Sequence, residues 1–563
     1  MQLSKAIAIV SLVFLMSSTL SRAQTTRDAT EFDQLKSLVI SQQKTLEHQQ
    51  AQIEALQQAL AEQKEMLANA LQRDGTDSTN IVSAVYHPSV ETSIATKPQA
   101  PQNPPPSDQE PLTPEQQKVE EELQRGPEIA DVTPDTPAVK LGPAKVRLIG
   151  YPALTAVYRS TNSGGNVGTS FTSIPFDNGA PGNTSEFRLS PQSTRLAIRV
   201  DADLQKSRAA GYFEMDFGGT VPGNVAVTSS SYGFRIRQAW FDYAWGKYEL
   251  TAGQLFSLMT PEKTDILPWP GDVATTQVID TNYVAGLVQG RYPQVRFVYH
   301  ASKATAFGFS LENPEQQVGS GSASGVIFPA GLSSILTTQY NTGSNELKVP
   351  NMTPDFVLKA AFNGKLAGRT SHLDVGTVFR VFRNYAPTST GSFSEKSHAG
   401  GFGVNADFSL EVLKNTRLVL NGFYGYGAGR YIGGLVPDVI VKANGNIQQI
   451  PAYSWVSGFE IAPNKATGFY VYYSGVYGQN ETTVDTNGKF IGWGYPGGSN
   501  AADRIVSEIT GGYSRVFWKH ENLGSVQAGF QYSYLWLQPW STGGGPNQAQ
   551  TNMFFSQLRY NLP

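Results

Sequence analysis

Five arginines occur in short runs in which charged and apolar residues alternate one by one. They are Arg195, Arg199, Arg235, Arg237 and Arg296. A guanidinium stays charged at any working pH, and its planar fork of N–H donors binds carboxylates through two hydrogen bonds. Because alternate residues of a strand share one face, these side chains are expected to line a common surface. The residue types therefore predict a surface that attracts and weakly binds small anions.

Two acids, Glu214 and Asp216, lie on a run between the arginine pairs. Opposite charges on neighbouring strands attract each other, so part of this set would form a structural ion-pair lattice. The arginines still outnumber the acids. A net positive stripe in a narrow, low-dielectric passage raises the local concentration of anions. Both interpretations stay open at the level of the sequence.

The elements that must position these charges are β-strands, because a period of two separates apolar from polar residues. Phe234 and Ile236 alternate with Arg235 and Arg237, and the runs 248–256 and 294–300 alternate in the same way. The polar face of a soluble sandwich carries Lys, Thr and Ser, whereas here it carries arginine. An apolar outer face with a charged inner face is typical of a barrel in lipid.

The alternating pattern holds from Lys145 to the end of the chain, with Gly, Asn, Asp and Ser turns between the runs. At roughly 25 residues for each strand and its connection, residues 144–563 predict an all-β transmembrane barrel of about 16 antiparallel strands. A later run sets Phe530 and Tyr532 on one face and Gln531 and Ser533 on the other. The outward positions predicted from two early runs are Leu196, Ile198, Val200, Phe213, Met215 and Phe217.

A barrel of this size is expected to keep an aqueous lumen rather than a packed interior. Tryptophans near the predicted strand ends are expected to form an aromatic girdle at the lipid interface. These tryptophans are Trp240, Trp245, Trp518, Trp536 and Trp540.

The segment 257–292 is far longer than a hairpin connection needs, and long ordered loops in compact folds are usually functional. If it folds inward, its acids face the arginines and create a transverse field across a constriction. If it stays outside, its acids are solvated. The charged residues assigned to this constriction are Glu262, Asp265, Asp272 and Arg291. His300, which follows, is expected to be a spectator.

Residues 1–23 have the pattern of a cleaved export signal. Lys5 supplies the positive start, residues 6–16 the apolar core, and residues 21–23 the small-x-small cleavage site. An uncleaved membrane anchor is the alternative, but the apolar run is shorter than the roughly 20 residues that span a bilayer.

Residues 24–75 contain an apolar seven-residue repeat, which predicts a periplasmic α-helical coiled coil. Its core positions are Val39, Leu46, Ile53, Leu60 and Leu67. The second seam of the repeat is partly glutamine, and polar layers of this kind fix the register and the number of chains. A lone solvated helix is the alternative. The absence of Pro and Gly from the repeat favours the oligomer.

Residues 76–143 are rich in proline and predict a disordered linker that buries no core. At about 3.1 Å per residue it reaches on the order of 200 Å, enough to bridge a periplasmic gap.

The composition excludes several classes of function. The chain has no cysteine, which excludes disulfides and thiolate metal sites, and no cofactor is expected. A net charge of −3 without a basic stretch argues against a nucleic-acid partner. The four histidines of the predicted barrel are scattered among unrelated strands, and neither G-x-S-x-G nor H-E-x-x-H occurs, so an enzyme is not expected.

Seven short segments, taken in their order and spacing, resemble the DcaP-like family of outer-membrane porins. They are Gly150–Leu154, Ser193–Arg195, Glu214–Phe217, Phe234–Ala239, Ala252–Gln254, Pro293–Arg296 and Leu311–Glu315. The leading repeat and the proline-rich linker are similar to that family too. The chain departs from the pattern at Gln238, where family members often carry histidine, and over residues 260–290. It also ends on Leu562 and Pro563 rather than on phenylalanine.

The resemblance implies a trimeric 16-stranded porin with a periplasmic coiled coil, which takes up small anionic solutes such as dicarboxylates. We therefore expect diffusion of small hydrophilic solutes across the bacterial outer membrane, with a preference for small anions. The expected partners are outer-membrane lipid, two further copies of the chain and the solutes, and peptidoglycan contact through the linker stays open. The alternatives are a general non-selective porin and a structural tether that links the barrel to the cell wall.

Overall fold

The computed structural model describes residues 137–563 except for 220–231, 270–272, 276, 320–324, 344, 346–347 and 389. The predicted export signal, the coiled coil and nearly all of the linker therefore lie outside the described residues, as does Asp272. Among the residues that the structure describes, no helix has both the length and the apolar character needed to cross a membrane.

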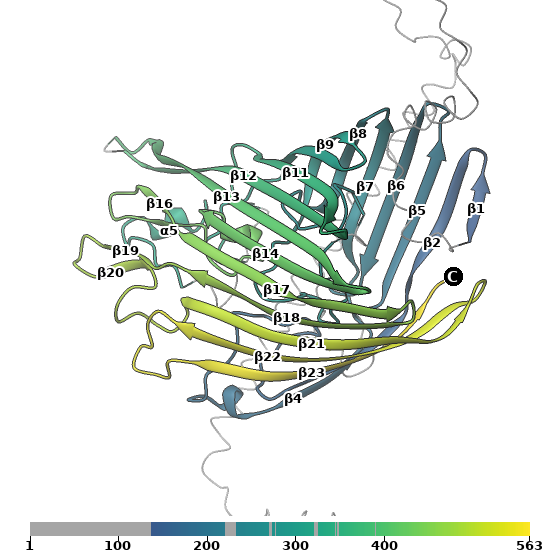
Figure 1. Ribbon diagram of the computed structural model, residues 1–563. Coiled ribbons are helices and arrows are strands. Elements are labelled where there is room, and N and C mark those ends of the chain that lie inside the picture. The colour runs from purple at the N-terminus through teal and green to yellow at the C-terminus, as the bar shows by residue number, and fades with distance from the viewer. Residues whose placement is uncertain are drawn as a thin grey trace, which may run out of the picture. The chain divides into compact units, whose positions relative to one another are not determined.

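Strands make up nearly all of the regular structure (Figure 1). The first half of the chain forms β1 (Ala138–Leu141), β2 (Ala144–Tyr151), β3 (Ala153–Arg159), β4 (Glu186–Ser190), β5 (Arg195–Asp203), β6 (Ser207–Asp216), β7 (Arg235–Trp245), β8 (Tyr248–Phe256), β9 (Arg291–Ser302), β10 (Thr305–Glu312) and β11 (Asp355–Leu366). The second half forms β12 (Arg369–Pro387), β13 (Phe393–Leu413), β14 (Thr416–Tyr426), β15 (Val439–Val441), β16 (Ile447–Gln449), β17 (Pro451–Asn464), β18 (Thr467–Gly478), β19 (Glu481–Val484), β20 (Phe490–Trp493), β21 (Asp503–His520), β22 (Gly524–Pro539) and β23 (Ala549–Asn561). Three short helical turns lie in the connections: η2 (Ala180–Asn183), α5 (Ser333–Leu336) and η6 (Gly429–Tyr431).

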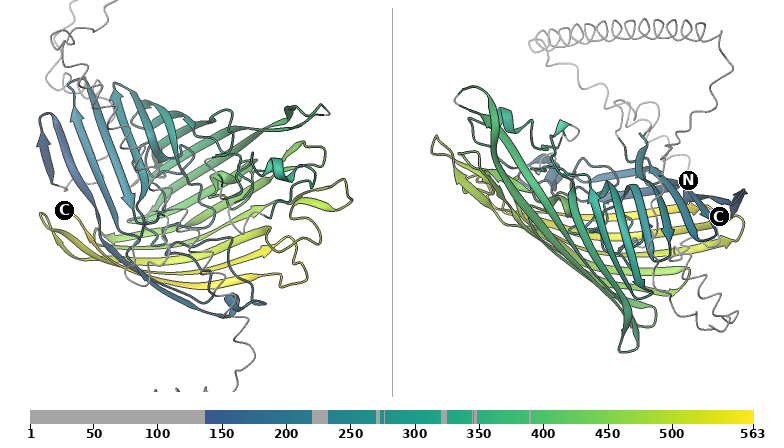
Figure 2. Two further views of the ribbon diagram at one scale, coloured as in Figure 1. Left: turned by 180° about the vertical axis from the view of Figure 1, so that it is seen from behind. Right: turned by 90° about the horizontal axis from the view of Figure 1, so that it is seen from above.

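One antiparallel sheet contains 19 of these strands, and two small hairpins, β15–β16 and β19–β20, lie in connections. From β5 to β23 the strands of the sheet pair in the order of the chain, with the hairpins β15–β16 and β19–β20 left out. At the start, β2 pairs with β5 and β3 with β4, and the last strand, β23, pairs with β3 (Met553 opposite Arg159). The backbone N–H of Leu562 also donates to the carbonyl of Gly150 at 2.9 Å. The sheet curves round an interior, as the two views of Figure 2 show.

Connections differ in length between the two edges of the sheet. One edge has tight turns, such as Ala367–Gly368, where both residues have a positive φ (51° and 78°). Such turns match the twist of the strands that they join, which is why the chain can reverse within two residues. The other edge has the long segments 257–290, 313–354, 427–450 and 479–502. Barrels of the bacterial outer membrane have this asymmetry, with short periplasmic turns and longer extracellular loops.

The predicted alternation of faces is confirmed. Ile198 and Phe530 point away from the interior, with 44% and 57% of their surface exposed, whereas Gln531 and Ser533 are buried. Phe and Val side chains continue this exposed apolar belt over the other strands. Exposed apolar surface of such extent marks contact with a membrane or a protein.

The interior is only partly open. The expectation of an aqueous lumen without a packed interior is therefore wrong. Side chains of β9–β12, β14, β17 and β18 meet those of the segments 257–290, 427–450 and 479–502 in a large buried apolar cluster. Trp240 belongs to a second buried cluster, 5.4 Å from Trp269 between ring centroids, and is not part of a lipid-facing girdle. Loops that return into the interior supply apolar partners, which alternation along the strands alone does not reveal.

The strand β1 begins inside the segment predicted to be a linker. It pairs with β2 through a tight turn at Gly142, whose φ is +62°. The turn lets the chain fold back on the first wall strand, so regular structure begins a few residues earlier than expected.

A charge placed on the outer face tests the lipid contact. Leu358→Arg, near the middle of β11, is expected to cost about 2–4 kcal/mol of folding free energy, whereas Leu366→Arg, at the turn end of the same face, costs about 0–1 kcal/mol. Reversible unfolding from lipid vesicles measures both. Equal costs at the two positions would show that this face does not contact hydrocarbon.

Candidate functional site

The segment 257–290, which we call the inward loop, leaves β8 and turns into the interior. The Ser257 hydroxyl and the Leu258 N–H both donate to the Glu312 carboxylate of β10 at 2.8 Å. A buried backbone N–H needs a partner, and Glu312 supplies one where no strand does. The start of the inward loop is therefore fixed to the wall beside it.

A second anchor lies on β11 and β12. Lys359 places its Nζ 3.1 Å from Asp374 and donates to the carbonyl of Thr260 at 2.7 Å. Asp374 accepts from the N–H of Glu262 at 3.0 Å, and the Glu262 carboxylate lies 3.9 Å from Lys359. Glu262 thus faces a lysine of the neighbouring wall rather than the arginines of β5–β7.

The inward loop then crosses to the opposite wall. The Ile279 N–H donates to Gln531 of β22 at 2.7 Å, and the Ala285 N–H donates to Glu508 of β21 at 2.9 Å. The loop therefore spans the interior and narrows it. Of the two alternatives that the sequence left open, the structure has the inward one.

Two of the predicted arginines are matched by the two predicted acids. Arg237 binds Glu214 at 2.6 Å and Asp216 at 3.0 Å, and Arg235 binds Asp216 at 2.7 Å. A β-bulge in β7 turns both Arg237 and its neighbour Gln238 toward the interior, so that Arg237 is only 1% exposed. This part of the arginine set is an ion-pair lattice.

Two further arginines hold the inward loop. Arg199 lies 2.7 Å from Asp201, and its guanidinium stacks 4.0 Å from the ring of Trp269 in the loop. Arg296 is buried and donates to the carbonyls of Phe256 at 2.6 Å and Leu267 at 3.4 Å. These contacts give both side chains a positioning role.

The remaining charges predicted for the constriction are separated from one another. Asp265 lies 3.5 Å from His300, which also contacts Glu249 at 3.3 Å. Arg291 places its guanidinium 5.4 Å from the ring centroid of Phe256. The single transverse array of loop acids and wall arginines expected from the sequence is therefore not formed by the described members of the set.

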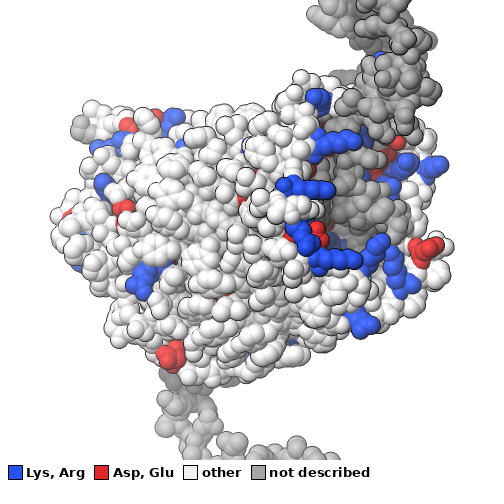
Figure 3. All heavy atoms as spheres, in the orientation of Figure 1, with Lys and Arg blue, Asp and Glu red and all other residues white. Residues whose placement is uncertain are grey.

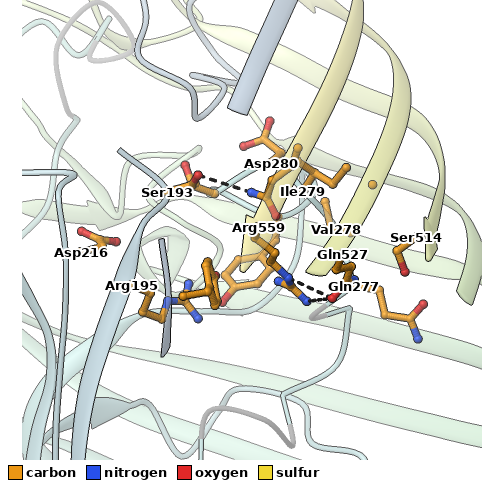
Figure 4. Close-up of a pocket in the computed structure, with 15 residues that line it drawn as sticks. Ser193, Arg195, Asp216, Gln277, Val278, Ile279, Asp280, Ser514, Gln527 and Arg559 are labelled. Atoms are coloured by element: carbon orange, nitrogen blue, oxygen red, sulfur yellow. Dashed lines mark hydrogen bonds between the residues drawn. The ribbon is translucent and has the colours of Figure 1, made fainter. Parts of the chain in front are cut away.

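An interior cavity of about 320 Å³ lies between the inward loop and the strands β2, β5, β6 and β21–β23 (Figure 4). Its lining contains two arginines, Arg195 and Arg559, whose guanidiniums lie 5.8 Å and 4.8 Å from the ring centroid of Tyr151. Figure 3 shows Lys and Arg side chains gathered around a hollow in the face that it presents. The cavity and the buried apolar cluster occupy different parts of the interior.

The two arginines of the lining are weakly paired. The Arg195 side chain keeps 27% of its surface exposed, and its nearest acid, Glu214, is 3.9 Å away. Arg559 donates to the neutral Gln527 amide at 2.7 Å and has no acid within 4.0 Å among the described residues. The same lining contains two acids, Asp216 and Asp280.

Sequence reasoning named Arg195 and missed Arg559. Alternation around Phe554 and Leu558, both exposed, places Gln557 and Arg559 on the inner face of β23. This alternation is visible in the sequence and is sufficient to place Arg559 on the inner face. The sequence does not reveal the curvature of the sheet. This curvature brings β23 beside β2, so that strands from both ends of the chain line one cavity.

No protein-family model matches the chain, and no curated protein matches it in sequence. Among solved structures, the outer membrane channel DcaP of Acinetobacter baumannii matches with a TM-score of 0.52 and 16% identity, over 74% of this chain and 97% of that one. The chain shares the fold of this channel.

Other outer-membrane proteins match with lower scores. OmpT of Vibrio cholerae has a TM-score of 0.38 at 8% identity, over 76% of this chain and 100% of that one. An anion-selective porin from Comamonas acidovorans has a TM-score of 0.39 at 11% identity, over 74% and 100%. The match to DcaP has a TM-score above 0.5, and it confirms at the level of fold the resemblance expected from the sequence.

The Glu312 anchor yields a test of the inward loop. Glu312→Ala leaves the buried donors of Ser257 and Leu258 without an acceptor, at a cost of about 1–3 kcal/mol for each. We expect trypsin to cleave after Lys263 at least ten-fold faster, as measured by mass spectrometry. Glu411→Ala, at the turn end of β13 and half-buried, is the control. Equal rates of cleavage after Lys263 in the unaltered protein and in both variants would show that Glu312 does not hold the loop.

Proposed function

We propose that the sheet closes as a barrel of 16 strands. Without β1, and with β2–β3 and β4–β5 each counted as one interrupted strand, the 19 strands of the sheet become 16. The pairings β2–β5, β3–β4 and β23–β3 support closure, because each joins the beginning of the wall to a neighbour. A closed wall has no free edge, as a structure surrounded by lipid requires.

We propose that this barrel is an outer-membrane porin through which small hydrophilic solutes diffuse. The observation that carries the proposal is a polar cavity next to a loop that spans the interior of a wall with an apolar exterior. The fold shared with DcaP supports it. The turn between β1 and β2 lies at the edge with tight turns, which supports a periplasmic location for the N-terminal residues.

The proposed solutes are small anions. Glu214 and Asp216 are engaged by Arg235 and Arg237, so the charges of the lining without such a partner are the cations Arg195 and Arg559 and the single acid Asp280. Positive potential in a confined, low-dielectric space enriches anions and lowers their barrier to entry. The resemblance implies dicarboxylates as the class of anion.

Removal of one cavity arginine is expected to reduce the preference for anions. Arg559→Gln keeps a polar side chain beside Gln527 but removes a charge that no nearby acid neutralises. In planar bilayers under a KCl gradient, we expect the ratio of chloride to potassium permeability to fall at least three-fold. Arg188→Gln is the matched control, because Arg188 is exposed and pairs with Glu186 at 3.1 Å. An unchanged ratio for Arg559→Gln, or an equal fall in both variants, would contradict the proposal.

We further propose a homotrimer, supported by the heptad repeat and by an apolar groove on the outer face. The groove has a volume of about 500 Å³, and the glycines Gly511 and Gly512 form its floor between Phe187, Phe530 and Phe554. Grooves of this kind accept side chains of a neighbouring subunit.

Deletion of residues 32–71 tests the contribution of the heptad repeat. If the repeat supports the trimer, the deletion lowers the temperature at which oligomers dissociate by at least 10 °C, as followed by native mass spectrometry in detergent. Val39→Asp with Ile53→Asp, which disrupts the same seam without shortening the chain, should act in the same direction. An unchanged dissociation temperature in both variants would show that the barrel walls alone hold the oligomer.

A further inference from the structure

The lining of the cavity is asymmetric in its chemistry. Both arginines lie against one aromatic ring, that of Tyr151, so they form a single positive pole. Figure 4 shows Arg195 to one side of Arg559, and Gln277 and Ser514 to the other. The rest of the polar lining consists mainly of neutral amides and hydroxyls: Ser193, Gln277, Thr281, Ser514, Gln527 and Gln557.

Two hydrogen-bond acceptors of the lining lack a donor. Gln277 Oε1 and Asp280 Oδ2 are buried and have no partner among the described residues. Asp280 Oδ1, by contrast, accepts from the N–H groups of Thr169 at 3.2 Å and Asn282 at 2.8 Å. Buried acceptors without a donor are costly, so a solute that brings hydroxyl groups gains more here than one that does not.

The same lining disfavours a second carboxylate on the solute. Asp216 and Asp280 both belong to the lining, and neither faces a cation left free, because Asp216 already binds Arg235 and Arg237. An additional anionic group would lie beside these acids, and like charges in a low-dielectric site repel strongly. One carboxylate fits the arginine pole, and hydroxyls fit the remainder.

We propose that the cavity selects hydroxylated monocarboxylates, the class of the sugar acids, over dicarboxylates and over plain fatty monocarboxylates. The inference rests on the proposed porin function and specifies its solute. The carboxylate lies at Arg195 and Arg559, and the hydroxyls donate to Gln277 and Asp280. A volume of about 320 Å³ is at the small end of the roughly 300–1,000 Å³ usual for small-molecule sites.

The test compares gluconate with hexanoate, which has the same charge and the same number of carbons, and with succinate, a dicarboxylate. The full-length protein in planar bilayers is given potassium gluconate, hexanoate or succinate against potassium chloride, and reversal potentials yield relative permeabilities. We expect the permeability of gluconate to exceed that of hexanoate at least three-fold, although gluconate is the bulkier anion. It should also exceed the permeability of succinate. Equal or higher permeability for hexanoate or succinate overturns the proposal.

Variants separate selection at the cavity from selection elsewhere in the channel. Gln277→Leu and Ser514→Ala should each lower the ratio of gluconate to hexanoate permeability at least two-fold. Gln289→Leu, in the same loop but outside the lining, should leave this ratio and the chloride to potassium ratio as they are. An unchanged gluconate to hexanoate ratio in both cavity variants overturns the proposal.

The unaltered protein also separates this inference from the porin proposal. A channel that prefers potassium over chloride refutes the proposed anion-selective porin itself. A channel that prefers chloride but favours succinate refutes only the assignment of the solute.

Discussion

A peptide segment that crosses the interior of a barrel must find hydrogen-bond partners for its N–H and C=O groups away from bulk water. The inward loop meets this requirement with side chains of the wall. Glu312 and Asp374 accept from it on one side, and Gln531 and Glu508 accept from it on the other. Because these acceptors stand on rigid strands, the position of the loop is fixed, and the open part of the interior is fixed with it.

The distribution of charge follows from that position. Arg199 and Arg296 are used to hold the inward loop, and Arg235 and Arg237 are balanced by two acids. The proposed preference for anions therefore depends on two residues from opposite ends of the sheet, Arg195 and Arg559. A count of arginines on the early strands finds only the first of them.

Local patterns gave reliable predictions where a property depends on neighbours in the chain. The outward faces of Ile198, Phe213 and Phe530 follow from alternation, since each strand separates lipid from interior in the same way. The role of Glu262 does not follow, because its partner Lys359 is distant in the sequence and becomes adjacent only after the loop has crossed to β11. Trp240 was misplaced for a similar reason, since its partner Trp269 lies on the loop.

The absence of cysteine from the chain makes one measurement especially direct. A Cβ built on Gly529 of β22 would lie 3.0 Å from the side chain of Ile279, at the point where the inward loop reaches the far wall. In the double variant Ile279→Cys and Gly529→Cys, a loop held across the interior predicts that mild oxidation forms a disulfide in the folded protein, as measured by mass spectrometry. Failure to crosslink without denaturant would contradict this position of the loop.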